Sequence, residues 1–253
     1  MCMEDTVVLQ TKDLTVGYDG RGVLRGMNFS VHTGEIVTLI GPNGAGKSTI
    51  LKTIARQLAI VSGKVQLLDQ DLFRMPANAL AKQMALVMTE RIAPELMTCY
   101  DVVAMGRYPY TGYMGRLAPE DQNSIDSAIA LVDMQQFADR PFVAVSDGQR
   151  QRVMLAKAIC QEPTLLLLDE PTSYLDIKYK LELMKILTGL AKSHRMGILM
   201  SLHELNLAKR ISDTVVCVRD DGVSAIGSPE TVMRPEAMEA LFDLQPGDSA
   251  VFL

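Results

Sequence analysis

A glycine-rich segment near the N-terminus has the residue types and spacing of a phosphate-binding loop. Gly41-Pro42-Asn43-Gly44-Ala45-Gly46-Lys47-Ser48-Thr49 fits the pattern G-x-x-x-x-G-K-[ST]. Glycines allow backbone N–H groups to turn toward an anion, and a helix that starts at the loop adds a positive dipole end. The ammonium of Lys47 can reach the β- and γ-phosphates of a nucleotide, and the hydroxyl of Ser48 can ligate Mg²⁺. A glycine-rich turn with an incidental lysine is the alternative, which the apolar run before the loop disfavours.

Two adjacent acids follow an uninterrupted apolar run at residues 165–168. Such a run predicts a buried strand of a parallel sheet. At its end, Asp169 is expected to hold Mg²⁺ through water, and Glu170 is the candidate general base for an attacking water. Alternatively, the two acids only cap the next helix. The presence of the Lys47 loop in the same chain favours the catalytic interpretation.

Four further residues could contribute to a nucleotide site, and each has a structural alternative. Ser146 and Gln149 have the spacing of a capping box, so they could simply start a helix. A helix start also supplies the free N–H groups that bind phosphate. His203 alone would more often be a packed or surface histidine, and Tyr18 alone a turn tyrosine.

The order of these motifs resembles that of the nucleotide-binding subunit of ABC transporters, over roughly residues 6–245. Val145-Ser146-Asp147-Gly148-Gln149 resembles the family's signature segment, and Ser173-Tyr174-Leu175-Asp176 resembles its D-loop. His203 resembles the switch histidine, and Tyr18 lies where the family stacks an aromatic ring on adenine.

The resemblance implies an ATPase that uses ATP and Mg²⁺ to drive transport, with Glu170, His203 and Lys47 as its catalytic residues. In the family, two subunits pair head to tail, and each ATP lies between one subunit's phosphate loop and the other's signature. The implied partners are a second copy of the chain, integral-membrane permease subunits and, indirectly, an extracytoplasmic substrate-binding protein. The expected nucleotide-binding residues are Tyr18, Gly41, Pro42, Asn43, Gly44, Ala45, Gly46, Lys47, Ser48 and Thr49, with Ser146, Gly148 and Gln149 reaching the partner's ATP.

Two positions depart from the family pattern. Asp147 stands where the signature usually has glycine, and its carboxylate should point away from a triphosphate or stabilise the helix start. The family's metal-sensing glutamine is replaced in Ala85-Leu86-Val87-Met88-Thr89-Glu90. Thr89 occupies the glutamine's place and Glu90 reaches further, so either Thr89 or Glu90 could contact the metal that Ser48 and Asp169 hold.

The segment Gly106-Arg107-Tyr108-Pro109-Tyr110-Thr111-Gly112 resembles part of the importers for iron–siderophore complexes, haem and cobalamin. Its tyrosines suit either a protein interface or the packing of a helical subdomain. The resemblance implies an importer of ferric siderophore or a related metal chelate. A non-transport ABC ATPase acting on nucleic acid or ribosomes, and the motor of an exporter with separate subunits, are the alternatives.

Strand-like runs alternate with helical patterns, which predicts an α/β fold with a parallel sheet. The helix predicted from Asp176 places Ile177, Leu181, Met184 and Leu187 on one face. Strands are expected at residues 6–9, 14–16, 23–32, 35–40, 64–68, 84–88, 164–168, 197–201 and 214–218, and helices at about 46–57, 122–137, 204–210, 229–233 and 235–243.

The resemblance adds an architecture to these elements: a P-loop NTPase core of the RecA-like type, with an N-terminal antiparallel β subdomain and an inserted helical subdomain. The chain would form one cassette. The ATPase core with its β subdomain is expected to occupy residues 1–90 and 160–225, the helical signature subdomain 91–159, and a C-terminal helical end 226–253.

The composition narrows the class of protein. With 48% hydrophobic and 22% charged residues among 253, the chain is typical of a globular protein. Its net charge of −5 argues against a nucleic-acid partner. The four cysteines lack metal-ligand spacing and are expected to be reduced thiols. Apolar runs are short and no signal peptide is visible, which predicts a soluble, intracellular protein. The resemblance implies that this protein is peripheral, on the cytoplasmic face of the cell membrane.

Overall fold

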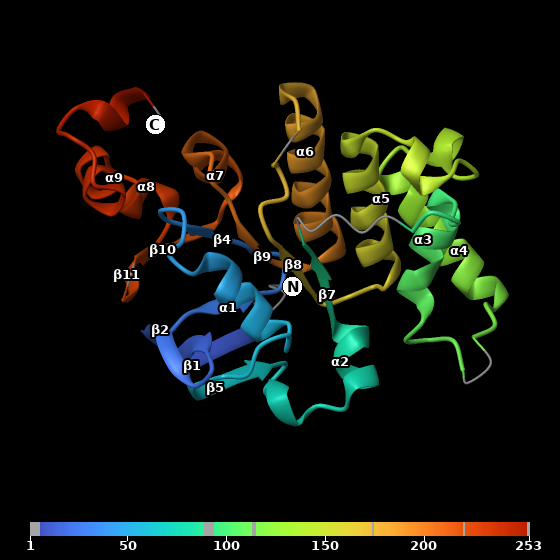
Figure 1. Ribbon diagram of the computed structural model, residues 1–253, viewed down its shortest axis with the longest axis horizontal. Coiled ribbons are helices and arrows are strands. Elements are labelled where there is room, and N and C mark those ends of the chain that lie inside the picture. Colours follow the sequence, from blue (N-terminus) through green and yellow to red (C-terminus); the bar gives the residue numbers. More distant parts are fainter. Residues whose placement is uncertain (1–5, 89–93, 113–114, 174, 220, 252–253) are drawn as a thin grey trace, which may run out of the picture.

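The protein is built on one mixed β-sheet whose faces and ends are covered by helices (Figure 1). The computed structural model describes residues 6–88, 94–112, 115–173, 175–219 and 221–251. Within these ranges, no helix combines the length and the apolar character that a membrane crossing requires.

Five parallel strands form the part of the sheet that carries the predicted chemistry. In spatial order they are β7 (Met84–Val87), β8 (Leu165–Leu168), β9 (Gly197–Ser201), β4 (Ile36–Ile40) and β10 (Thr214–Arg219). Every residue of β4, β8 and β9 is buried. Strands buried on both faces are expected to be apolar without alternation, which is why these runs could be predicted from the sequence.

The alternating side chains of β4 divide between two hydrophobic cores. Ile36 and Ile40 belong to a core that includes residues of α5 (Asp147–Cys160) and α6 (Ile177–His194). Val37 and Leu39 belong to a second core that includes residues of α1 (Lys47–Ile54) and the N-terminal strands. Because successive side chains of a strand point to opposite faces, β4 packs against helices on both faces of the sheet.

Antiparallel strands extend the sheet beyond β10. β11 (Gly222–Gly227) pairs antiparallel with β10 and parallel with β2 (Arg21–Met27). β2 in turn pairs with β1 (Val7–Tyr18), whose other partners are β3 (Ser30–His32) and β5 (Ser62–Leu67), and β6 (Gln70–Asp71) forms the edge. The predicted α/β core and N-terminal antiparallel strands are confirmed.

Helices between β7 and β8 pack on one another, and Figure 1 shows them on one side of the sheet. They are α3 (Cys99–Ala104), α4 (Pro119–Leu131) and α5. The remaining helices are α2 (Ala77–Gln83), α7 (Leu205–Ile211), α8 (Pro229–Val232) and α9 (Pro235–Phe242), the last two at the opposite side in Figure 1. The subdomain boundaries given above remain predictions.

The predicted elements differ from the observed ones at several places. The runs 6–9 and 14–16 are one strand, β1, and the predicted strand 23–32 is two, β2 and β3. The apolar face predicted for α6 is buried only in its later turns. Met184 and Leu187 are buried, but Ile177 is 78% and Leu181 44% exposed, so the first turns of this helix are not covered by the core.

Candidate functional site

The glycine-rich segment is a loop between the end of β4 and the start of α1, as predicted. Gly46 is the residue before α1, with φ of 94°, and no side chain caps the first N–H groups of the helix. The uncapped start leaves backbone donors available for an anion. Gly41 serves a different purpose, because a Cβ there would lie 2.0 Å from the carbonyl oxygen of Val218 on the neighbouring β10.

Lys47 begins α1 and is buried, with 4% of its surface exposed. Its Nζ donates to the carbonyl oxygens of Gly41 (2.7 Å) and Pro42 (2.8 Å), so the loop curls around the ammonium. Burial lowers the pKa of Lys47, and the negative charges of Glu170 and Asp169 oppose that shift. A cation in such a desolvated position interacts strongly with an anion.

Asp169 and Ser48 meet although 121 positions separate them. The Ser48 hydroxyl donates to Asp169 Oδ1 at 3.0 Å, and the buried Ser201 hydroxyl donates to the same oxygen at 2.7 Å. A serine hydroxyl and a carboxylate are the hard oxygen ligands that Mg²⁺ prefers, and this ion usually keeps waters and substrate phosphates as its other ligands. Among the described residues, no group of three or more His, Cys, Asp or Glu side chains could hold a metal on its own. The donors present therefore fit Mg²⁺ bound together with a phosphate.

Glu170 and His203 are brought together at the carboxyl ends of β8 and β9. Glu170 Oε1 is hydrogen-bonded to His203 Nε2, and the Ser173 hydroxyl donates to Glu170 Oε2 at 3.2 Å. Glu170 has a left-handed backbone, with φ of 47°, and its N–H donates to Ser201 Oγ at 2.9 Å. Two of the three predicted catalytic side chains, Glu170 and His203, are thus neighbours of the residues predicted to bind Mg²⁺.

Tyr18 ends β1 and lies beside the phosphate loop. A hydrogen bond of 3.1 Å joins its Oη to Thr49 Oγ1, near the start of α1. The residue is 50% exposed. This arrangement presents an aromatic ring to solvent next to the loop, as stacking on a base requires.

The signature residues form a helix start, as the structural alternative predicted. Ser146 is the N-cap of α5; its N–H donates to Gln149 Oε1 (2.9 Å) and the Gln149 N–H donates to Ser146 Oγ (3.3 Å). A Cβ at Gly148 would lie 3.4 Å from Tyr179 on α6. Asp147 pairs with Arg150 at 3.3 Å, in agreement with a role at the helix start. In Figure 1, α5 and α1 lie apart, so the signature residues do not lie beside the phosphate loop of the same chain.

A hydrogen-bond network next to His203 was not predicted. The Glu204 carboxylate accepts from Thr172 Oγ1 (2.6 Å) and from Lys180 Nζ (2.5 Å). Burial raises the pKa of Glu204, but the hydrogen bonds from Lys180 and Thr172 and the positive charge of Lys180 together outweigh it, so this pKa lies below its usual value. The only sequence signal was an acid directly after the histidine. The network ties α6 and the loop after β8 to the segment of His203.

Parts of two predicted segments lie outside the described residues. They are Thr89 and Glu90, the alternatives for the missing glutamine, and Tyr174 of the D-loop segment.

The segment 106–112 is anchored inside the helical insert. Arg107 is buried, and its guanidinium contacts Asp121 (2.9 Å), the Cys160 carbonyl (2.8 Å) and Glu162 (3.1 Å). The ring of Tyr110 lies 3.9 Å from the same guanidinium. Packing therefore explains Arg107 and Tyr110, whereas 59% of Tyr108 is exposed.

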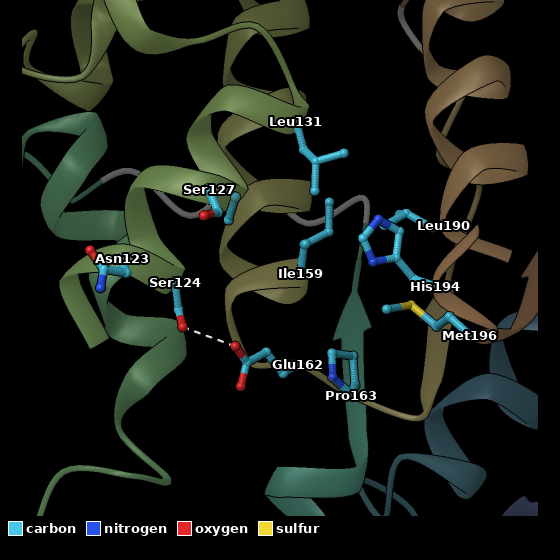
Figure 2. A pocket seen from close by; sticks show the side chains of 11 residues that line it. Asn123, Ser124, Ser127, Leu131, Ile159, Glu162, Pro163, Leu190, His194 and Met196 are labelled. Carbon is cyan, nitrogen blue, oxygen red and sulfur yellow. Dashed lines mark hydrogen bonds between the residues drawn. The ribbon is translucent and has the colours of Figure 1, made fainter. Parts of the chain in front are cut away.

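A hollow of about 370 Å³ lies between α4, α5 and the end of α6. Figure 2 shows Leu131 and Ile159 on one side of it and His194 and Met196 on the other. Ser124 donates to Glu162 at 2.9 Å along its rim. None of the predicted site residues lines this hollow.

Comparisons with known proteins agree with these motifs. A family model described as ABC transporter matches residues 24–173. An uncharacterized ABC transporter ATP-binding protein of Methanocaldococcus jannaschii is 44% identical, covering 94% of this chain and 82% of that protein. The iron(3+)-hydroxamate import ATP-binding protein FhuC of Bacillus subtilis is 40% identical, covering 93% of this chain and 88% of that protein.

A solved structure of a metal-chelate type ABC transporter in an inward-facing conformation is similar in fold. Its TM-score is 0.83 at 26% identity, and the match covers 94% of this chain and 89% of that one.

Proposed function

This chain belongs to the ABC transporter ATP-binding family, and on that premise we propose that it hydrolyses ATP as the motor subunit of an importer for metal chelates. The observation that carries the ATPase part is the meeting of Ser48, Asp169, Glu170 and His203 beside the buried Lys47. These side chains follow β4, β8 and β9, which are distant in the chain but adjacent in the sheet. In open α/β sheets, ligands bind at the carboxyl ends of the strands, where these residues lie.

Each residue has a role in this proposal. The N–H groups at the start of α1 and the Lys47 ammonium bind the phosphates, and Tyr18 stacks on the base. Glu170 accepts a proton from the attacking water, and the hydrogen bond from His203 holds its carboxylate in place. Ser48 and Asp169 would hold Mg²⁺, which neutralises charge on the phosphate oxygens when bound.

We also propose that two copies pair head to tail around two ATP molecules. The start of α5 would then present its N–H groups and positive dipole end to the γ-phosphate bound by the other copy. The Ser146 and Gln149 side chains hold this helix start in shape, and Gly148 lies in its first turn. Dimer closure by ATP would be the movement that drives transport.

The proposed cargo is a ferric siderophore or a related metal chelate. The FhuC relative carries hydroxamate import in its name, and the similar solved structure is a metal-chelate type transporter. The proposed partners are integral-membrane permease subunits, with an extracytoplasmic substrate-binding protein acting through them. The protein would then be peripheral to the membrane.

The ATPase proposal is tested with Lys47→Ala, measured by phosphate release from ATP. We expect kcat to fall by at least about 100-fold, as for the loss of one charged group at a transition state. Lys52→Ala, on the same helix, is the control and should retain turnover. Undiminished hydrolysis in Lys47→Ala would remove the loop from the site.

The dimer and the cargo need separate tests. Glu170→Gln, which should bind ATP without hydrolysing it, should elute as a dimer with ATP and as a monomer with ADP on gel filtration. For the cargo, the chain is co-purified with its membrane partner, both are reconstituted in vesicles, and ATP-driven uptake of ferric siderophore, haem and cobalamin is compared. Hydrolysis stimulated by RNA, with no membrane partner recovered, would contradict the transport proposal.

A further inference from the structure

Ser201 is placed between the two acids by the register of the parallel strands. In the pairing of β8 with β9, Leu167 lies opposite Leu199 and Leu168 opposite Met200. Ser201 is therefore the next residue along β9, where Asp169 and Glu170 leave β8. On its other side, Ser201 lies opposite Leu39 of β4, the strand that leads into the phosphate loop. A residue at this position reaches the ends of both strands.

The Ser201 hydroxyl connects both acids in one chain of hydrogen bonds. It accepts a hydrogen bond from the backbone N–H of Glu170 at 2.9 Å and donates one to Asp169 Oδ1 at 2.7 Å. A hydroxyl can do both at once because it has one donor and two lone pairs. Ser48 approaches the same Oδ1 atom from the phosphate loop at 3.0 Å. Ser201 thus holds from inside the sheet the carboxylate that Ser48 contacts from the loop.

Burial makes this contact consequential. Ser201 is fully buried and Asp169 is 5% exposed, so water does not readily replace a missing hydroxyl. The N–H of Glu170 points to Ser201 in a left-handed backbone conformation that non-glycine residues rarely adopt. The hydrogen bond to Ser201 supports that conformation, which places the Glu170 side chain against His203.

We propose that Ser201 is a positioning residue for ATP hydrolysis: its hydroxyl orients the Asp169 carboxylate for the metal and fixes the backbone that presents Glu170. The proposal rests on the function proposed above. Ser201 touches neither ATP nor the reacting atoms in this role, and it acts through the two acids.

The test is Ser201→Ala, read out by the binding of mant-ADP with Mg²⁺ and with EDTA. We expect the enhancement of affinity by Mg²⁺ to fall about 10- to 100-fold, the range of one hydrogen bond to a charged group. Binding in EDTA should stay within about twofold of the parent, because the loop and Tyr18 are untouched. The KM for ATP with Mg²⁺ should rise with the weakened Mg²⁺-dependent binding, and kcat should fall as well, because the backbone that presents Glu170 is no longer held.

Thr11→Val is the matched control. Thr11 is also a buried hydroxyl that both donates to and accepts from backbone, since its Oγ1 donates to the Phe29 carbonyl (3.2 Å) and accepts the Phe29 N–H (3.0 Å). It lies in β1, outside the site. Its loss should lower the thermal stability and leave the Mg²⁺ enhancement unchanged. Ser201→Cys, which has a slightly larger side chain with a weak donor, covers the case in which Ser201→Ala does not fold.

The outcomes separate this proposal from the proposed function. If Lys47→Ala loses hydrolysis but Ser201→Ala and Ser201→Cys keep the parent's Mg²⁺ enhancement, Ser201 is not a positioning residue and the ATPase assignment stands. A positioning role is also overturned if Ser201→Ala and Thr11→Val reduce kcat equally, because the effect is then one of stability. If Lys47→Ala retains hydrolysis, the function itself is wrong.

Discussion

Replacing Arg107 by methionine should destabilise the protein by about 3 kcal/mol, because it breaks a buried ion pair from one side. The guanidinium lies 2.9 Å from Asp121 and 3.1 Å from Glu162, and it also donates to the Cys160 carbonyl at 2.8 Å. Its side chain is 6% exposed and that of Asp121 is 8% exposed. Methionine keeps much of the volume and removes every one of these donors.

The magnitude follows from what the remaining groups can do. Breaking a buried pair typically costs about 3–5 kcal/mol. Two features favour the lower end of that range. Asp121 keeps a hydrogen bond of 2.8 Å from the Ala118 N–H, and 57% of the Glu162 side chain is exposed to water. For a protein of this size, about 3 kcal/mol corresponds to a loss of about 6–12 °C in Tm.

Urea unfolding followed by circular dichroism measures the change. Arg74→Met is the control, because Arg74 pairs with Asp71 at 3.4 Å with 88% of its side chain exposed, and its loss should cost well under about 1 kcal/mol. A free-energy change in Arg107→Met no larger than in Arg74→Met would refute this reasoning. Such a result would mean that Asp121 loses little free energy when its buried partner is removed.

The same variant should change the response to acid. The Ala118 N–H lowers the pKa of Asp121, burial opposes this, and the hydrogen bond from Arg107 lowers the pKa further. A carboxyl with a lowered pKa stabilises the fold above its unfolded pKa, and that stability is lost as the pH falls. Arg107→Met should therefore lose less stability than the parent between neutral pH and acid, although not all of the slope, because the Ala118 hydrogen bond remains.

Three further changes test other parts of the structure. Gly41→Ala should abolish mant-ADP binding and cost about 2 kcal/mol in urea unfolding, because its Cβ would lie 2.0 Å from the Val218 carbonyl oxygen; wild-type binding would contradict this packing effect. Tyr18→Ala should weaken ATP binding by about 1–3 kcal/mol in calorimetry, whereas Tyr18→Phe should keep most of the affinity, and equal affinities in all three proteins would exclude stacking. Lys180→Met should lower stability at pH 7 by about 1 kcal/mol. Because the pKa of Glu204 lies below its usual value of 4.5, the parent's advantage should vanish as the pH falls below that value, and a constant difference would refute the pairing.

The parallel core and the glycine-rich loop could be predicted because their signals are local. Fully buried strands such as β8 are continuous apolar runs, and a phosphate loop has a fixed spacing of glycines, lysine and serine. The short strands and helices β6, α2 and β11 carry no comparable pattern. In β11, half-buried and exposed residues alternate between glycines at both ends, and its pairing with β10 decides its structure.

The site shows where sequence reasoning ends. The meeting of Ser48 with Asp169 followed from two motifs, but the bridging role of Ser201 depends on the register of β9 against β8. No periodicity in the sequence reports such a register. For α6, helical spacing placed Ile177 and Leu181 on one face with the later apolar residues, but the surrounding elements cover only the later turns of the helix.

The left-handed backbone of Glu170 implies a trade-off between the thermal stability of the fold and the rate of ATP hydrolysis. A residue with a Cβ in that conformation costs about 1–2 kcal/mol relative to glycine, which adopts it freely. A library of variants selected only for surviving heat should therefore enrich glycine at position 170, and the survivors should be inactive. Selection for hydrolysis should instead retain glutamate at position 170. The residue found there would therefore show whether stability or turnover had been selected.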